Sequence, residues 1–382
     1  MHAPADPFDP RHFEAVRRPL DEASTMPPWV YTSDAFYRRE VDRIFMKVWN
    51  FMGHVDQVPE PGDYMALEFV GVPFIVCRDE GGKLRAFANS CRHRGAQVAT
   101  GKGNTKEFMC PYHGWCYGLD GRLTATVDMD RTKNFDNADY GLIPIAVDTW
   151  GGFIFVNFDP DCGSLADYLG DLPDNLASHR LEEMANVRAV EFELNHNWKL
   201  FVENAKESYH IAVVHRETIN QVAPVTSADY TVSAAAGEYC TTFATHDGSM
   251  ALLKDDPGFP PIESLEGRYR NGTYAPLIYP MTYLACTIDT AWFLQLFPMG
   301  PNRTKLIHGA CFPKDRRDRP DFETLAANYY KRWDRTILED IEAGDQQQVG
   351  VASPFARPGR FCFREPLVHQ IDNWILDRVL DG

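Results

Sequence analysis

Two short segments of the chain each carry one cysteine and one histidine. They read Cys91-Arg-His93 and Cys110-Pro-Tyr-His113, with sixteen residues between His93 and Cys110. Thiolate and imidazole side chains are ligands of soft and borderline metal ions. The pattern therefore predicts one metal centre whose four ligands come from two loops.

Two kinds of centre are compatible with these four ligands. A zinc ion could take all four in a tetrahedron, but zinc sites usually group two cysteines in one knuckle and two histidines on a helix. One Cys and one His in each loop suits a [2Fe–2S] cluster in which one iron has two thiolates and the other two imidazoles, the Rieske arrangement. Gly95 and Gly114 would let the backbone approach such a cluster. We favour the cluster over zinc.

The other cysteines give no further site. The chain has nine, at positions 77, 91, 110, 116, 162, 240, 286, 311 and 362. An odd number of widely spaced cysteines in a large chain favours free thiols in a reducing compartment over a disulfide framework. We interpret Cys116 as a small buried thiol after the second loop and assign the remaining six to packing.

A second group of potential ligands lies in the segment "NWKLFVENAKESYHIAVVH", residues 197–215. Glu207 and His210 would share one helical face, because positions i and i+3 are neighbours. His215 is roughly 140° further around an ideal helix, so the helix must bulge or end before both histidines can bind one metal. Two histidines and one carboxylate form the open site of non-haem Fe(II) oxygenases.

Helical periodicity selects the carboxylate ligand. Residues 321–345 place an apolar stripe at Phe322, Ala326, Tyr329, Trp333 and Ile337. Asp340 falls on this stripe, and a carboxylate facing a core needs a partner such as a metal. The other acids of the segment are predicted to point well away from it: Glu339, Glu342 and Asp345. An ordinary capping or salt-bridged Asp340 is the alternative.

The order of the expected elements predicts an α+β fold. Thr32-Ser33-Asp34 can cap a helix, short β-like runs with a "DEGG" hairpin signal fill about 50–160, and a helix is expected to start at Trp198. Strands are expected within 228–312, and helices at about 320–346 and 365–380. We expect a helical segment at 1–48 that packs on the catalytic domain, an antiparallel β domain with both Cys-His loops at 49–160, and a catalytic domain of helices and antiparallel sheet at 161–382.

Composition limits the partners. The 382 residues include 38 basic and 54 acidic side chains, a formal charge of −16, without a basic stripe for nucleic acid. The start "MHAPADPFDP" lacks a basic segment followed by an apolar run, and no stretch reaches 18 apolar residues. We therefore expect a cytoplasmic protein that binds neither nucleic acid nor membrane.

The two ligand groups together resemble a known family. The residues "CRHRGAQV" and "FMCPYHGWCYGLDGRL" are similar to the Rieske domain of ring-hydroxylating, Rieske non-haem iron oxygenases, in the large (alpha) oxygenase subunit. Respiratory Rieske proteins carry an extra disulfide-forming Cys in each loop, where this chain has Ala96 and Tyr112. The spacing E-x2-H-x4-H at 207–215 and the segment "EDIEAGDQQQVG" at 339–350 both resemble the family's iron-ligand patterns.

The resemblance implies roles for individual residues. His210, His215 and Asp340 would bind a mononuclear Fe(II), and Asn204 would be a polar group near it, with helix capping or a surface role as alternatives. In the family an acid at the position of Glu207 bridges an iron-ligand His and a Rieske-ligand His of the neighbouring subunit. Carried over, the path runs from His113 of one chain through Glu207 of the next, and the assembly is a homotrimer, with or without a small beta subunit.

The implied function is that of the terminal oxygenase component of a multicomponent system. No G-x-G-x-x-G after a strand and no plant-type C-x4-C-x2-C run is present, so electrons should come from a flavin reductase, with or without a ferredoxin. Two substrate classes remain open: an aromatic compound hydroxylated on its ring, as in aromatic hydrocarbon catabolism, or an N-alkyl or quaternary ammonium compound that is N-demethylated. Glu rather than Asp at 207 resembles the oxygenases of carnitine and glycine betaine. Rings that could hold a cation are Tyr209, Tyr239, Trp292, Phe293 and Phe297.

A function of another class is an electron carrier, or a binding protein that lacks mononuclear iron. More than 200 residues beyond the β domain argue against the carrier, and the His210, His215 and Asp340 set argues against loss of the iron.

Overall fold

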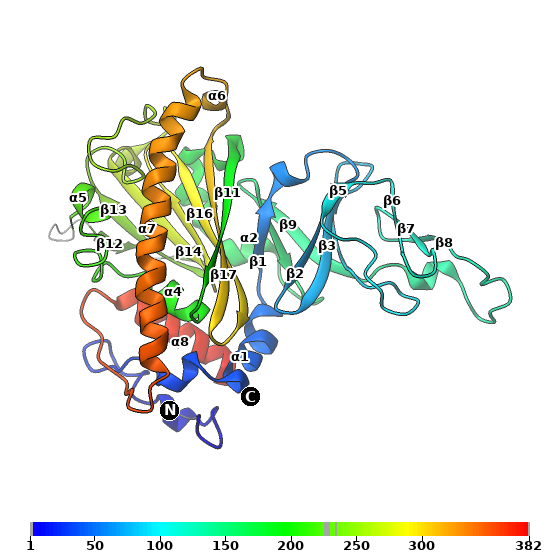
Figure 1. Ribbon diagram of the computed structural model, residues 1–382, viewed down its shortest axis with the longest axis horizontal. Helices are drawn as coiled ribbons and strands as arrows, with labels where there is room; N and C mark the ends of the chain where they lie inside the picture. The colour runs from blue at the N-terminus through cyan, green and yellow to red at the C-terminus, as the bar shows by residue number, and fades with distance from the viewer. Residues whose placement is uncertain (1–2, 225–229, 234, 381–382) are drawn as a thin grey trace. The chain divides into compact units, whose positions relative to one another are not determined.

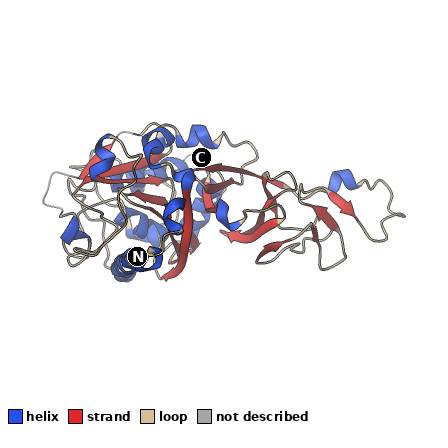
Figure 2. Ribbon diagram, turned by 90° about the horizontal axis from the view of Figure 1, so that it is seen from above, coloured by secondary structure: helices blue, strands red, loops and turns tan. Residues whose placement is uncertain are grey.

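The chain folds into two compact units. The computed structural model describes residues 3–224, 230–233 and 235–380. One unit is Phe45–Leu165, and the other combines Met1–Ile44 with Ala166–Gly382 (Figure 1). Figure 2 shows that the longer helices belong to the larger unit, whereas the smaller one consists mostly of strands and loops. The predicted α+β class is confirmed.

The smaller unit is built from antiparallel sheets. A seven-stranded sheet has the order β1-β10-β9-β4-β3-β2-β5, and a three-stranded sheet the order β6-β7-β8. The bounds in chain order are β1 (Asn50–His54), β2 (Asp63–Phe69), β3 (Val72–Arg78), β4 (Leu84–Ala88), β5 (Lys102–Asn104), β6 (Glu107–Met109), β7 (Cys116–Gly118), β8 (Leu123–Ala125), β9 (Pro144–Trp150) and β10 (Phe153–Asn157). The "DEGG" hairpin is confirmed, because β3 pairs antiparallel with β4 around it. The two Cys-His loops follow β4 and β6.

The larger unit contains a second seven-stranded antiparallel sheet. Its order is β11-β17-β16-β15-β14-β13-β12, so the long β11–β17–β16 strands form one side. The bounds are β11 (Met184–Leu194), β12 (Tyr230–Ser233), β13 (Tyr239–Thr245), β14 (Gly272–Ile278), β15 (Thr282–Cys286), β16 (Ala291–Gly300) and β17 (Arg303–Pro313). Strands were expected at 228–312, and β12–β17 lie there, with β17 ending one residue later at Pro313.

One long helix covers this sheet. Helix α7 (Phe322–Val351) runs across its face (Figure 1) and packs Phe322, Ala326, Tyr329 and Trp333 into an aromatic core with Phe312 of β17. The predicted apolar stripe thus faces the sheet. Burying such large rings is the main apolar contribution that fixes where α7 lies. The last predicted helix is α8 (Pro366–Leu380).

Shorter helices complete the larger unit. They are α1 (Asp34–Glu40), α2 (Leu165–Leu169), α3 (Leu172–Leu176), α4 (Trp198–Asn204), α5 (Ile219–Val222) and α6 (Lys314–Arg317). The predicted cap of α1 is present, because Ser33 Oγ accepts the Phe36 N–H at 3.2 Å. Helix α4 starts at Trp198 as predicted but ends at Asn204, so the expectation that Glu207 and His210 lie on one helix is wrong.

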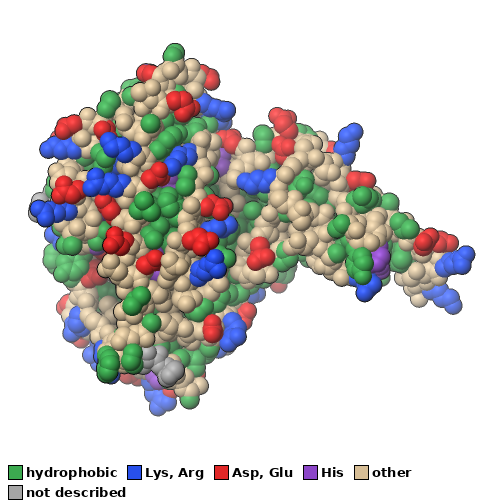
Figure 3. Space-filling view, viewed as in Figure 1, with side chains coloured by type: hydrophobic (Ala, Val, Ile, Leu, Met, Phe, Trp, Pro, Cys, Tyr) green, Lys and Arg blue, Asp and Glu red, His purple; other side chains and the backbone are tan. Residues whose placement is uncertain are grey.

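Figure 3 shows acidic and basic side chains interspersed over the visible face of the molecule. Among the described helices, none combines the length and the apolarity that crossing a bilayer requires.

A buried polar network connects the first residues of the chain to α4. Lys199 Nζ lies 2.6 Å from Glu40 Oε1, with both side chains fully buried. Tyr31 donates its hydroxyl to Glu203 at 3.0 Å. Burial raises the pKa of Glu203 to about 7, although Tyr31 and Lys199 act in the opposite direction. Burial and the neighbouring Glu203 also raise the pKa of Asp372. The two buried carboxyls therefore retain protons at pH values where free carboxyls are ionised.

This network predicts a specific pH dependence of stability. The folded state holds the Glu203 proton more tightly than the unfolded chain, so its stabilising contribution is present below about pH 4.5 and is lost as the pH rises to about 7. Glu203→Gln removes this titration. When the pH rises from 5 to 8, the free energy of unfolding of the variant should increase by about 1–2 kcal/mol relative to that of wild type, which corresponds to roughly 2–6 °C in Tm. Thermal unfolding at both pH values measures this change, with the exposed Glu182→Gln variant as control. The same Tm difference between Glu203→Gln and wild type at pH 5 and pH 8 would contradict the prediction.

Candidate metal centres

The two Cys-His loops have the same local backbone geometry. In the first, the Gly95 N–H donates to the Cys91 carbonyl at 2.9 Å, and in the second the Gly114 N–H donates to the Cys110 carbonyl at 3.0 Å. Both glycines have positive φ, +80° and +69°, which a side chain rarely tolerates. Each cysteine N–H is bonded in turn to the carbonyl five residues on, that of Ala96 or Trp115. Two equivalent turns thus present the four predicted ligands.

The ligand atoms of these loops fit a two-iron cluster better than one ion. His93 Nδ1 and His113 Nδ1 face each other at 3.1 Å, the separation of two ligands on one metal. Four ligands of a single tetrahedral zinc would lie within about 4 Å of one another. Within the described residues, three or more possible ligand atoms come within 4.8 Å of one another only at His210, His215 and Asp340. The two imidazole nitrogens are therefore close enough to share one metal, but the two thiol sulfurs lie further from them than ligands of the same ion would.

Neighbouring side chains fix the loops. The Tyr117 hydroxyl lies 3.2 Å from Cys91 Sγ and accepts the Arg92 N–H at 2.9 Å. The His93 ring stacks on Trp115, with 4.9 Å between centroids and 14° between planes. Both cysteines are buried, whereas His93 is exposed and His113 half-buried. The imidazole side of the centre is thus the side that another molecule can reach.

The cysteine assignments agree with this geometry. None of the nine cysteines forms a disulfide. Burial raises the pKa of Cys116, which favours the neutral thiol over a metal-binding thiolate. Its Sγ lies 3.5 Å from the Gly114 carbonyl, as a packed side chain of the turn.

The second group of predicted ligands is brought together by turns and by α7. After α4 ends, residues 205–218 form successive turns rather than a helix. The Val214 N–H bonds to the His210 carbonyl at 2.8 Å, and the His215 N–H to the Ile211 carbonyl at 3.1 Å. The two imidazole centroids are consequently 5.1 Å apart. Asp340 reaches the same point from α7, as its place on the apolar stripe predicted.

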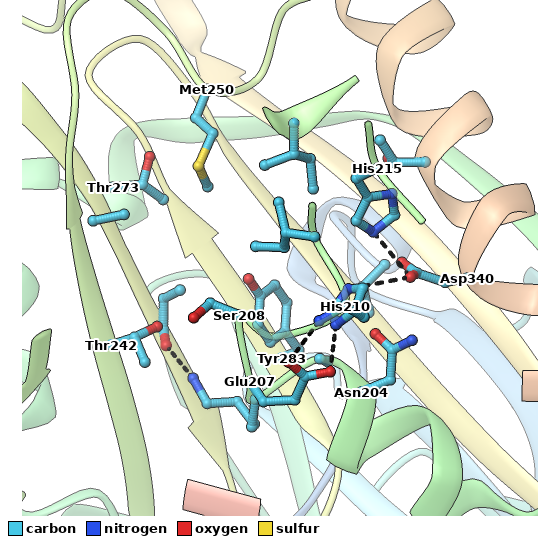
Figure 4. Close-up of a pocket in the computed structure, with 18 of the residues that line it drawn as sticks. Asn204, Glu207, Ser208, His210, His215, Thr242, Met250, Thr273, Tyr283 and Asp340 are labelled. Carbon is cyan, nitrogen blue, oxygen red and sulfur yellow. Dashed lines mark hydrogen bonds and ion pairs between the residues drawn. The ribbon is translucent and has the colours of Figure 1, made fainter. Parts of the chain in front are cut away.

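The inner atoms of the three side chains converge. His215 Nε2 is 2.9 Å and His210 Nε2 is 3.7 Å from Asp340 Oδ1. Figure 4 shows both rings directed at this carboxylate across a small gap. Asp340 Oδ1 is buried and has no partner with hydrogen-bond geometry in the described residues.

The outer nitrogen of each imidazole is held by a different carboxylate. His210 Nδ1 lies 2.5 Å from Glu207 Oε1, and His215 Nδ1 lies 2.8 Å from Glu339 Oε2. A neutral imidazole that donates from Nδ1 has a lone pair on Nε2. Two such lone pairs then face an ionised carboxylate oxygen, an arrangement that is unfavourable unless a cation lies between them. The donor set therefore fits a divalent metal, with outer carboxylates that fix the ring tautomers.

The electrostatics of His215 agree with a cation site. Burial lowers its pKa, but the hydrogen bonds and charges of Asp340 and Glu339 raise it by more, so that the net direction is upward. The same two carboxylates that favour a positive ring would favour a bound cation.

The contact of Glu339 with the metal centre was not predicted from the sequence. Helical periodicity correctly placed it off the apolar stripe, but the conclusion that it has no part in the site is wrong. Thr218 donates to Glu339 Oε2 at 2.7 Å and Arg335 Nε to Oε1 at 3.1 Å, which orient the carboxylate toward His215. The available signal was the acidic pair itself, because consecutive helical residues can contact one ring from two sides. Asp345 instead pairs with His196 at 2.7 Å, and Glu342 is exposed.

A cavity of about 430 Å³ adjoins these three side chains (Figure 4). Asn204, at the end of α4, lines it on the side of Asp340, while Met250 and Thr273 lie at the other end of the view. Of the five aromatic residues considered for holding a cation, only Trp292 lines the cavity. Tyr209 is 60% exposed, Phe293 and Phe297 are buried elsewhere, and Tyr239 lines a separate hollow. The expected aromatic cage is therefore not formed by that set.

The role of Glu339 can be tested through metal affinity. Glu339→Gln keeps the shape but offers an amide to His215 Nδ1 in place of a charged acceptor. The Kd for Fe(II), measured anaerobically by calorimetry on protein with an intact cluster, should rise about 10- to 100-fold. Glu342→Gln, one turn away and exposed, should bind as wild type. Equal Fe(II) affinity of Glu339→Gln and wild type would exclude this role.

Comparison with known proteins agrees with the fold and with both centres. Residues 48–136 match the model described as the Rieske [2Fe–2S] domain, and residues 181–381 match the ring hydroxylating alpha subunit (catalytic domain). These two matches define a Rieske-type oxygenase. The chain belongs to the family of ring-hydroxylating alpha subunits, as the sequence motifs predicted.

Several relatives span nearly the whole chain. The chloroplastic choline monooxygenase of Atriplex hortensis is 30% identical over 94% of this chain and 78% of its own. A glycine betaine monooxygenase oxygenase subunit of Pseudomonas aeruginosa is 27% identical over 99% of this chain and 94% of its own. Among solved structures, a quaternary ammonium Rieske monooxygenase superposes with a TM-score of 0.81 at 22% identity, covering 94% and 96% of the two chains. The naphthalene 1,2-dioxygenase of Rhodococcus sp. gives 0.80 at 22% identity, covering 98% and 99%.

Family membership confirms the predicted chemistry at the level of class. The protein is an O2-dependent oxidoreductase with a Rieske [2Fe–2S] cluster and a mononuclear non-haem iron, and it needs an external electron donor. The carrier and binding-protein alternatives are thereby set aside.

Proposed function

We propose that the protein is the terminal oxygenase of a multicomponent system that hydroxylates an N-methyl carbon of a small organic substrate. The observation that carries the proposal is the cavity that opens beside the converging atoms of His210, His215 and Asp340. Relatives named for choline and glycine betaine oxidation extend over almost the whole chain, which supports an N-methyl substrate. Aromatic ring hydroxylation is the second candidate, favoured by the apolar walls at Trp292 and Leu294.

In this proposal the chain's own residues position two metal groups. Cys91, His93, Cys110 and His113 hold the cluster, and His210, His215 and Asp340 hold the iron. Bound iron supplies O2 reduction and C–H oxidation, with one oxygen atom entering the C–H bond and the other leaving as water. Glu207 and Glu339 hold the two imidazoles with Nδ1 outward and Nε2 toward the iron position, and the cavity walls exclude water from the substrate. Asn204 adds a polar group at the edge of the site.

The domain boundaries at 49–160 and 161–382, with residues 1–48 packed on the catalytic domain, are part of the same proposal. A cytoplasmic location and electron delivery by a flavin reductase, with or without a ferredoxin, complete it.

Product chemistry tests the proposed reaction. With a surrogate NADH-dependent reductase, an N-methyl substrate should give one formaldehyde per O2 consumed, because the hydroxylated N-methyl carbon leaves as formaldehyde. Ring-hydroxylated products from aromatic compounds, without formaldehyde from any N-methyl compound, would replace this function by the second candidate.

We further propose a homotrimer in which each cluster donates to the iron of a neighbour, with or without a small beta subunit. Exposed apolar residues flank both centres: Met109 and Tyr112 beside His113, and Tyr209 and Val213 beside His210. Exposed apolar clusters of this kind are typical of subunit contacts. The side chain of Glu207 is 12% exposed, so it can also accept a hydrogen bond from the partner subunit's His113.

Glu207→Gln tests the electron path. The variant keeps the side-chain length but loses the charge and one of two acceptor oxygens. At saturating Fe(II) both metals should be bound, and the cluster should be reducible. In a single turnover of pre-reduced protein with O2 and substrate, cluster oxidation should slow by roughly 10- to 100-fold. The exposed Glu217→Gln is the control. Normal cluster oxidation in Glu207→Gln would show that electron transfer does not depend on this carboxylate, and a fully active monomer would reject the intersubunit path.

A further inference from the structure

The cavity contains a buried lysine that the metal centre does not use. Lys206 lines the cavity, and only 2% of its surface is exposed. Its Nζ donates to the Ala275 carbonyl at 2.7 Å, which uses one of its three N–H donors. No carboxylate of the described residues lies within ion-pair distance of this ammonium or shifts its pKa. A buried charge without an ionic partner is costly and is usually retained for a reason.

Two of the aromatic side chains that line the cavity, Tyr283 and Trp292, already meet protein cations. Lys206 Nζ lies 5.6 Å from the centre of the Tyr283 ring. The guanidinium carbon of Arg332 lies 5.4 Å from the centre of the Trp292 ring. These contacts use the negative faces that would otherwise attract a substrate cation.

The cavity lining carries one more cationic side chain than carboxylates. The cationic side chains among the described lining residues are Lys206, Arg332 and Arg364, and the carboxylates are Glu207 and Asp340, or three against two. Both carboxylates pair with imidazoles of the metal centre, and a bound Fe(II) would add two positive charges beside them. His308 also lines the cavity, and burial lowers its pKa to about 3, so its ring is neutral.

From this arrangement we propose that the cavity selects substrates that carry a carboxylate, bound by the ammonium of Lys206, over substrates whose only charge is a cation. The inference rests on the proposed function, because it takes the cavity as the substrate site. It separates this chain from its choline-oxidising relatives: choline offers Lys206 no anion, whereas glycine betaine or an N-methylated aromatic acid does.

The state of Lys206 supports an anionic ligand. Burial lowers the pKa of Lys206 to about 8, so the amine is mostly protonated at pH 7. A carboxylate that accepts its two remaining N–H donors would replace the missing ionic partner. A hydrogen bond to a charged group contributes about 1.5–3 kcal/mol, roughly a 10- to 100-fold change in Kd.

Ligand pairs of similar shape but different charge test the proposal. Glycine betaine and choline share the trimethylammonium group, and benzoate and benzamide share the ring. Calorimetry on the iron-loaded holoenzyme should give a Kd at least about 10-fold lower for the carboxylate in each pair. Lys206→Met should weaken carboxylate binding about 10- to 100-fold and leave choline and benzamide within about threefold of wild type. Lys331→Met, which removes an exposed positive charge of α7 outside the cavity lining, should bind all four ligands as wild type.

The outcomes discriminate clearly. Two results would overturn the inference. One is that wild type binds choline as tightly as glycine betaine and benzamide as tightly as benzoate. The other is that the preference for carboxylates survives in Lys206→Met. If Lys206→Met does not fold, Lys206→Gln and the wild-type comparison of the two ligand pairs decide it. Because binding is measured without turnover, failure of the proposed function is seen separately: carboxylate selectivity without oxidation of any N-methyl compound would reject the reaction and keep the subsite.

Discussion

The convergence of three acceptor atoms at Asp340 is the constraint on which the catalytic unit depends. His215 Nδ1 is bonded to Glu339 and His210 Nδ1 to Glu207, so each ring directs its remaining lone pair at the same carboxylate oxygen. A protein interior does not tolerate facing lone pairs without a cation, and removal of either outer carboxylate would let a ring turn or change tautomer. The aromatic packing of α7 on the sheet and the turns after α4 are the means by which two distant segments are kept at this point.

The two centres use backbone in the same way. Each Cys-His loop closes on itself through a glycine with positive φ, and the segment after α4 closes through turns at His210 and His215. Turns can present side chains in directions that a continuous helix or strand cannot. The rigid elements behind them, the antiparallel sheets and α7, provide the fixed frame that a metal centre needs.

Local spacing predicted the parts of the site that depend on local geometry. The Cys-His loops, the i, i+3 contact of Glu207 with His210, and the inward direction of Asp340 could all be read from the chain. The end of α4 could not, because it depends on Glu207 itself: its carboxylate accepts the N–H groups of Tyr209 and His210, which starts a new turn in competition with the helix. Glu339 was missed because periodicity describes only its own helix, whereas its partner His215 comes from another segment.

The aromatic residues of the cavity illustrate the same limit. Trp292 and Leu294 line the cavity while Phe293 and Phe297 do not, since successive residues of β16 alternate between the two faces of the sheet. Which face is hollow depends on the packing of the whole unit. The positive character of the cavity was equally invisible in a chain of net charge −16, because Lys206 is one charge among many until its burial is known.

The most direct measurement is an anaerobic Fe(II) titration of protein with an intact cluster and an emptied mononuclear site, followed by nitric oxide and pulsed EPR. The account predicts one Fe(II) per chain whose iron–nitrosyl signal shows coupling to two imidazole nitrogens, from His210 and His215, and loss of that binding in Asp340→Ala. A signal without imidazole coupling, or full binding in Asp340→Ala, would contradict it.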